Sequence, residues 1–306
     1  MTKPLGINAL DIQKDYISVA QVDLADNSVQ QIVIQPLSEN DDSDSYWNAV
    51  SAELKALKKK FRFTRNDVAC SIPSDMAVVK ILEVESDERE QHNILRWELG
   101  AHLMGPVEDY AFDFYEVAPG RQADYRRYLA AAVRRETVAK LKKAVKGVNL
   151  SPVIMDLDLF ALTNVFQANY RERLSDASIL VHGENTRTKM TLVCNSSFVD
   201  YSIVGFEADM LDKAGYVAML QSEISLLISQ NSSISPAGQV SVYLAGSLFS
   251  NSQLAYAVTH GIPSCELLDP FRKLTCMADM DEEQLKTCSP QLAVSIGLAL
   301  RGDENR

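Results

Sequence analysis

The polar residues of this chain do not show the spacing of the common catalytic motifs. The serines lie outside any GxSxG turn, the four histidines show neither HxxxH nor HExxH spacing, and no Walker-type loop for phosphate occurs. The carboxylate pair Asp156 and Asp158 stands at the expected start of a helix, where N-capping accounts for acidic residues. The sequence therefore predicts no serine-hydrolase, zinc-protease or Walker-type chemistry.

The composition excludes further classes. The 306 residues are 46% hydrophobic and 23% charged, which is typical of a globular protein with two domains or one bilobed unit. A net charge of −11 counts against a nucleic-acid partner, because phosphate contacts need clustered Lys and Arg. No apolar run is long enough to span a membrane, the first residues lack the apolar core expected of a signal peptide, and the five cysteines form no CxxC pair. We expect a cytoplasmic protein without a metal site.

Alternating strands begin the chain. Residues 7–12, 16–22 and 28–34 alternate apolar and polar side chains and are separated by short turns, which predicts a three-stranded antiparallel meander. A helix is expected over 46–60, where apolar residues recur every three or four positions, and a buried strand over 67–73.

The same order of elements returns in the second half of the chain. Three strands are expected within 179–204, then a helix over 210–229 and a buried strand over 240–245. Because the meander, helix and strand occur twice, the sequence predicts an α/β fold with two similar lobes.

A different pattern separates the two copies. It is strand, helix, strand, strand and helix, with the first helix over 87–104 capped by Ser86. The expected domains are a first lobe over 1–77, an inserted α+β subdomain over 78–150, a return helix over 151–170, a second lobe over 171–285, and a C-terminal helix over 286–306 that packs back on the first lobe.

The C-terminal helix contains an unusual run of small residues. Ser289 as N-cap and Pro290 at the first helical position predict a helix that continues to Arg301. Small residues at every second position from 293 to 299 would let another backbone approach closely. The segment is therefore expected to be a closely packed terminal helix.

Several segments, taken in order, resemble one protein family. They are LRWE at 95–98, YLAAAV at 128–133, VIMD at 153–156, DPF at 269–271 and SPQLAVSIGLALRG at 289–302. Together they are similar to PilM, a family of type IV pilus assembly proteins in the actin-like ATPase superfamily. The resemblance implies an actin-like fold: duplicated, ribonuclease H-like and bilobed α/β, with a small α+β subdomain inserted in the first lobe.

Actin-like proteins hold nucleotide phosphates in two hairpin turns. Glycines there let backbone N–H groups approach the phosphate, and an aspartate in each turn handles the metal or the attacking water. The resemblance assigns Asp11 and Lys14 to the first turn, but Gln13 replaces the family's glycine and Asp15 adds a negative charge. A plain hairpin turn is the alternative interpretation.

The second turn departs further from the family, because Val181 stands where an aspartate is expected. In the adenosine-binding turn, a serine replaces the second of two glycines. Beyond the first turn, the resemblance assigns to the nucleotide site Gly183, Thr186, Glu223, Gly246 and Ser247. Three altered motifs predict that ATP hydrolysis is lost and that no cofactor is required. ATP with Mg²⁺ as a structural or switching ligand is the alternative.

PilM relatives bind the cytoplasmic N-terminal tail of the membrane protein PilN in a groove between the first lobe and its insert, a contact that suits an extended peptide. The resemblance places Val78, Val79, Ile81 and Trp97 near that junction, and core packing is the alternative for each. We expect an adaptor of a type IV pilus platform, with other pilus or secretion proteins as partners and the membrane reached only through them. A sugar kinase on the same fold is the rival hypothesis, but it requires an aspartate at Val181.

Overall fold

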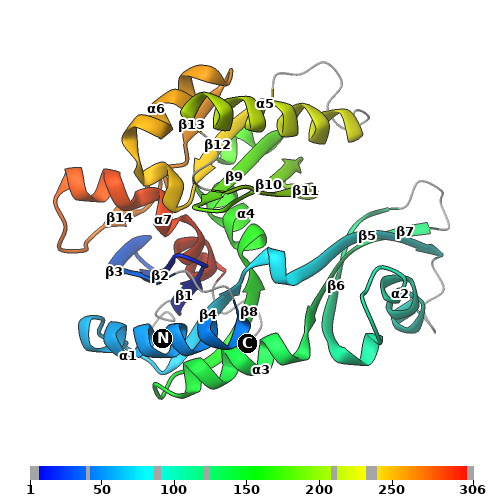
Figure 1. Ribbon diagram of the computed structural model, residues 1–306, viewed down its shortest axis with the longest axis horizontal. Coiled ribbons are helices and arrows are strands. Elements are labelled where there is room, and N and C mark those ends of the chain that lie inside the picture. Colours follow the sequence, from blue (N-terminus) through cyan, green and yellow to red (C-terminus); the bar gives the residue numbers. More distant parts are fainter. Residues whose placement is uncertain are drawn as a thin grey trace. The chain divides into compact units, whose positions relative to one another are not determined.

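The structure is a computed structural model that describes residues 7–38, 42–85, 91–119, 125–207, 212–231 and 240–301 (Figure 1). The chain divides into two compact units. The larger combines Met1–Ile72 with Val145–Arg306, and the smaller is the insert Pro73–Ala144. Among the described residues, no helix is both long and apolar enough to cross a lipid bilayer.

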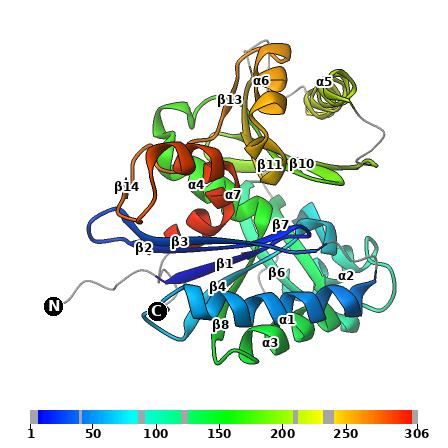
Figure 2. The same cartoon turned by 60° about the vertical axis from the view of Figure 1, so that its left-hand side comes forward.

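The larger unit contains a first sheet in the order β14-β3-β2-β1-β4-β8. The strands are β1 (Asn8–Ile12), β2 (Tyr16–Asp23), β3 (Ser28–Pro36), β4 (Asp67–Ile72), β8 (Ser151–Leu157) and the two-residue β14 (Thr275–Cys276). β1 to β3 form the antiparallel meander that the alternating residues predict, and β4 lies parallel to both β1 and β8. The helix α1 (Ser43–Lys60) lies along one face of this sheet (Figure 2), with its first turn capped by Asp42.

A second sheet in the same unit has the order β11-β10-β9-β12-β13. Its strands are β9 (Ser178–Glu184), β10 (Arg187–Cys194), β11 (Ser197–Gly205), β12 (Ser241–Ala245) and β13 (Cys265–Leu267). The helices α5 (Lys213–Gln230) and α6 (Ser252–Gly261) share a buried apolar core with these strands. The order repeats that of β3-β2-β1-β4-β8 in the first sheet. The predicted duplication is therefore confirmed.

Two helices, α4 (Asp158–Asn169) and α7 (Glu282–Leu300), lie between the two sheets (Figure 2). One buried core joins them to both sheets, with members such as Ala9 of β1 and Leu180 of β9. A Cβ atom on Gly297 of α7 would stand 1.9 Å from the carbonyl oxygen of Ala161 in α4. The small residues of α7 therefore do allow another backbone to approach closely, and that backbone is α4.

Two hydrogen bonds attach α7 to the two sheets. Ser18 Oγ on β2 donates to Ser295 Oγ at 3.0 Å, and the backbone N–H of Gly246, after β12, donates to the carbonyl of Pro290 at 2.8 Å. Both contacts come from the same stretch of α7. The helix thus holds elements of both sheets.

The start of α7 differs from the prediction. The helix begins at Glu282, capped by the Asp281 carboxylate, so Ser289 is not the N-cap and Pro290 lies inside the helix. Proline has no N–H, and the carbonyl of Lys286, four residues earlier, therefore lacks its helical donor. Ser289 Oγ donates to that carbonyl at 3.1 Å. The hydroxyl replaces the missing donor, which explains how the helix continues through the proline.

The strand β8 was not predicted, and it changes the role of one aspartate. Asp156 lies within β8 and forms an ion pair with Arg301 at 2.5 Å instead of capping a helix. The helix α4 begins at Asp158, with Leu157 at the N-cap position, and the Asp158 carboxylate accepts the N–H of Leu159 at 2.7 Å. Asp158 therefore stands in the first turn of α4.

The smaller unit is an antiparallel sheet in the order β5-β7-β6. Its elements are η1 (Ser74–Met76), β5 (Ala77–Glu85), α2 (Gln91–Gly100), η2 (Val107–Asp109), β6 (Tyr110–Pro119) and β7 (Tyr125–Arg134), and α3 (Arg135–Lys146) follows. α2 packs on one face, where Leu95 and Leu99 share a buried core with Leu82 and Tyr128. The helix predicted over 87–104 ends earlier than expected, at Gly100, and its predicted cap, Ser86, lies outside the described residues.

Candidate functional site

The turn between β1 and β2 follows Asp11, the first predicted site residue. The Asp11 carboxylate is fully buried and accepts hydrogen bonds from Gln13 Nε2 at 2.6 Å and Ser71 Oγ at 2.7 Å. Burial raises the pKa of Asp11 to about 6, against the opposing effect of His182. The N–H of Gln13 donates to the carbonyl of Tyr16 at 3.0 Å. The turn is thus closed on itself, with Gln13 as the partner of Asp11.

The charged residues at the tip of this turn have partners of their own. The Lys14 ammonium lies 5.4 Å from the centroid of the Tyr46 ring, a cation–π contact. The Asp15 carboxylate accepts a hydrogen bond from Ser247 Oγ, and burial raises the pKa of Asp15 although Ser247 lowers it. The structure therefore brings the predicted adenosine residue Ser247 to the first turn, where it binds a carboxylate.

A buried lysine that the sequence reasoning missed lies beside these turns. The Lys189 ammonium on β10 donates to Asp158 Oδ2 at 2.6 Å and to Gln13 Oε1 at 3.1 Å, and it pairs with Glu184 Oε1. The lysine side chain is only 3% exposed. Its partners Gln13, Asp158 and Glu184 come from three separate segments, so the local sequence around Lys189 does not reveal them. The cluster joins β9 and β10 to α4 and to the β1–β2 turn.

His182 extends this cluster. Its Nε2 lies 3.2 Å from the hydroxyl of Tyr16, and its Nδ1 lies 3.5 Å from Glu184 Oε1. Burial alone would raise the pKa of Glu184, but Lys189 and His182 lower it to about 2. Ligand atoms of Asp158, His182 and Glu184 all lie within 4.8 Å of one another, which is the grouping of a metal-ligand set.

The remaining predicted nucleotide residues are divided among several contacts. Gly183 and Gly246 pack against each other, and Gly246 has a φ of 99°, which favours glycine. Thr186 lies in the β9–β10 turn, where its carbonyl accepts the N–H of Phe206 at 2.9 Å. Glu223 on α5 is half-buried and accepts a hydrogen bond from Ser202 Oγ at 3.3 Å. The glycines therefore have a packing role that the sequence did not reveal.

The residues predicted for a peptide groove lie on two sides of the insert. Val79 on β5 is 1% exposed, whereas Val78 and Ile81 are half-buried. Ile81 alternates with Leu82 along β5, so it faces away from α2. Trp97 lies on α2 and is 74% exposed. The structure thus separates Trp97 from Ile81.

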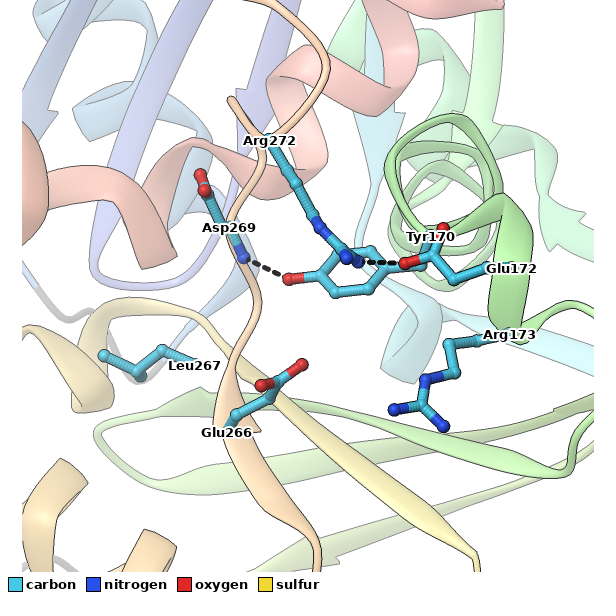
Figure 3. A pocket seen from close by; sticks show the side chains of 7 residues that line it. All are labelled: Tyr170, Glu172, Arg173, Glu266, Leu267, Asp269 and Arg272. Carbon is cyan, nitrogen blue, oxygen red and sulfur yellow. Dashed lines mark hydrogen bonds and ion pairs between the residues drawn. The ribbon is translucent and has the colours of Figure 1, made fainter.

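A polar pocket of about 640 Å³ lies elsewhere in the larger unit (Figure 3). It is lined by Tyr170, Glu172, Arg173, Glu266, Leu267, Asp269 and Arg272. The Arg272 guanidinium lies 4.6 Å from the centroid of the Tyr170 ring and pairs with Glu172 at 2.5 Å, and the Tyr170 hydroxyl accepts the N–H of Asp269 at 2.9 Å. Carboxylates and guanidinium groups stand side by side here. The mixed charge gives the pocket no preference for an anion such as phosphate.

Comparisons with known proteins agree with this architecture. A family model described as type IV pilus assembly protein PilM matches residues 9–185. No curated protein matches the chain in sequence. A chain in a solved PilM–PilN type IV pilus biogenesis complex is 20% identical with a TM-score of 0.79, and the match covers 99% of this chain and 100% of that chain.

Two further solved structures share the fold. One is a Bacteroides thetaiotaomicron protein with an actin-like ATPase fold and unknown function, 11% identical, with coverage of 96% and 95% and a TM-score of 0.55. The other is the cytoplasmic domain of EpsL, an inner membrane component of the type II secretion system of Vibrio cholerae, 11% identical, with coverage of 97% and 95% and a TM-score of 0.55. The predicted actin-like fold is confirmed.

Proposed function

Since the chain belongs to the PilM family of type IV pilus assembly proteins, we propose that it is a cytoplasmic adaptor of a pilus assembly platform. In this role it binds the cytoplasmic N-terminal tail of a PilN-like membrane protein, which holds it at the inner membrane, and it contacts other pilus or secretion proteins. The proposal is carried by the family match, together with the likeness over 99% of the chain to a protein in a PilM–PilN complex.

The insert offers an apolar row that supports this proposal. Ile81 on β5, Leu129 on β7 and Tyr115 on β6 stand opposite one another in the strand register, on the face of the sheet opposite α2. Tyr115 is 71% exposed. An extended peptide gains affinity when its side chains fill such apolar positions. We propose that the apolar row Ile81–Leu129–Tyr115 contacts the tail.

The proposal also holds that the nucleotide site is lost. The Lys189 ammonium, a cation that could meet phosphate, is already bound to Asp158 and Glu184. The carboxylates of Asp15 and Glu184 stand in the two turns that hold phosphates in actin-like proteins, where they would repel a triphosphate. The Gly246 backbone lies against Gly183. These residues do not fit a nucleotide with its magnesium ion.

Calorimetric titration with a synthetic N-terminal tail of a PilN-like protein tests the partner. We expect binding by the wild-type chain and a loss of affinity of at least about tenfold for Ile81→Asp, because this change places a charge in the apolar row. Tyr256→Ala is the matched control, since it removes an exposed aromatic side chain of α6 in the larger unit. Absence of binding by the wild type would contradict the proposal.

Titration with ATP and Mg²⁺ tests the nucleotide claim separately. We expect no heat of binding and no phosphate release. Binding without turnover would replace this part of the proposal with the alternative in which ATP is a structural or switching ligand. Turnover that requires a sugar would favour a kinase, against which the valine at position 181 counts.

A further inference from the structure

We propose that the Lys189 ammonium is a resident cation that takes the place of a divalent metal ion among Asp158, His182 and Glu184. The three residues offer ligand atoms of the kinds that zinc and similar metals bind, grouped within 4.8 Å. The inference concerns the larger unit alone and does not depend on the partner tail.

Lys189 Nζ is surrounded by three oxygen atoms of the kind that also bind metal ions. Asp158 Oδ2 lies at 2.6 Å, Gln13 Oε1 lies at 3.1 Å, and Glu184 Oε1 is in direct ion-pair contact. Bonds from zinc to oxygen or nitrogen are about 2 Å long, so a bare ion would need only a small inward movement of these ligands. The side chains of all these residues are buried. The position is therefore a formed, water-poor site and not a surface cluster of acids.

His182 has the orientation of a metal ligand. Its Nε2 lies 3.2 Å from the Tyr16 hydroxyl, and its Nδ1 faces Glu184 Oε1 at 3.5 Å. In metal sites the second ring nitrogen of a histidine is held by an outer partner in this way. The histidine thus adds a ring nitrogen, Nδ1, that faces one of the two carboxylates.

The charges of the cluster require a cation. Asp158 and Glu184 are 2% and 1% exposed, and buried carboxylates are costly unless they are paired. Lys189 is the cation nearest to both, and Arg187 reaches Glu184 only at 4.0 Å. Because the lysine is carried on β10, the cation is supplied by the chain itself. Removing it should leave a site that recruits a cation from solution.

The test is Zn²⁺ binding and thermal unfolding of Lys189→Ala in the full chain. We expect the variant to lose roughly 10 °C in Tm without metal, because two buried carboxylates lose their nearest cation. Zn²⁺ should restore most of this loss. Equilibrium dialysis should show one bound equivalent more than the wild type, a difference that removes any contribution from the cysteines. Co²⁺ at the same stoichiometry should give the visible absorption of a tetrahedral site.

The matched control is Lys189→Ala with His182→Gln, which lacks the imidazole ligand and should bind no extra metal. If Lys189→Ala does not fold alone, it should be refolded from denaturant with and without Zn²⁺, and folded protein should then be recovered only with the ion. The proposal is overturned if Lys189→Ala gains neither an equivalent of metal nor stability from it. It is also overturned if the His182→Gln control gains both.

Discussion

A Cβ atom on Gly246 would stand 2.3 Å from the carbonyl oxygen of Gly183, so the backbones of these two glycines are in contact. The family resemblance assigns both residues to a nucleotide, yet each fills the space beside the other. The turn after β12 therefore packs directly on the end of β9. Their glycine identity follows from backbone packing within the second sheet.

Gly246→Ala should destabilise the protein by about 3 kcal/mol, because the methyl group would clash with Gly183 and the φ of 99° disfavours alanine. Chemical denaturation measures the change. Gly105→Ala is the control, since Gly105 has a φ of 108° but nothing within 4 Å of the added Cβ, and it should cost about 1 kcal/mol. Equal losses for both variants would show that backbone contact with Gly183 has no energetic role.

Gly297→Ala should be the more damaging of two helical glycine substitutions. The added Cβ would stand 1.9 Å from the Ala161 carbonyl oxygen, so α4 and α7 would have to separate, at a cost of at least about 3 kcal/mol. Gly100→Ala in α2 meets only Val107 at 4.0 Å and should stabilise the insert by roughly 0.5–1 kcal/mol through helix propensity. The unfolding free energy of each variant measures the effect, and the changes for Gly297→Ala and Gly100→Ala should have opposite signs.

Asp11→Asn should change the pH dependence of stability. The folded-state pKa of about 6 exceeds the ordinary 3.8, so the contribution of Asp11 is fully present below pH 3.8 and is lost as the pH rises through about 6. The Asp11→Asn variant lacks this pH-dependent loss of stability. Relative to wild type, its unfolding free energy should therefore rise by up to about 3 kcal/mol across that interval. Denaturant titrations at a series of pH values give the difference, and a constant difference would contradict the assignment.

Ser289→Ala should cost about 1 kcal/mol in the wild-type background, because the carbonyl of Lys286 loses its donor. With Pro290→Ala already present, a backbone N–H becomes available to that carbonyl, and the serine change should cost almost nothing. A double-mutant cycle of unfolding free energies measures this coupling. Additive costs would mean that the hydroxyl does not compensate for the proline.

The periodicity of the sequence was sufficient to predict the duplicated lobes, because each meander alternates over many residues. Two of the strands that escaped prediction, β13 and β14, contain three and two residues, too few for a periodic signal. The predicted start of α7 at Pro290 was wrong because Ser-Pro is a common helix start, whereas here the helix begins earlier, after its N-cap Asp281. The sequence does not show that the Ser289 hydroxyl compensates for the proline, because this role depends on its hydrogen bond to the Lys286 carbonyl.

The site was harder to predict than the fold. Asp11 and Glu184 flank turns that the resemblance located. The role of Lys189, however, depends on its contacts with Asp158 and Gln13, which are distant in sequence. From the sequence, a charged residue in a strand is expected to be solvent-exposed, and its burial depends on neighbouring elements that the local sequence does not reveal. Family motifs pointed to the correct region of the chain, while the chemistry there depends on residues outside those motifs.

The two hydrogen bonds on α7 have a mechanical consequence. Ser18 and Gly246 belong to different sheets, and their acceptors on α7, Ser295 and Pro290, lie little more than one helical turn apart. Any swinging of one sheet away from the other must break one of these bonds or bend the helix between them. Hydrogen–deuterium exchange at the amide of Gly246 should therefore be as slow as in the strand cores. Such protection would show that α7 holds the two sheets of the larger unit in a fixed arrangement, so that the unit moves as one rigid body.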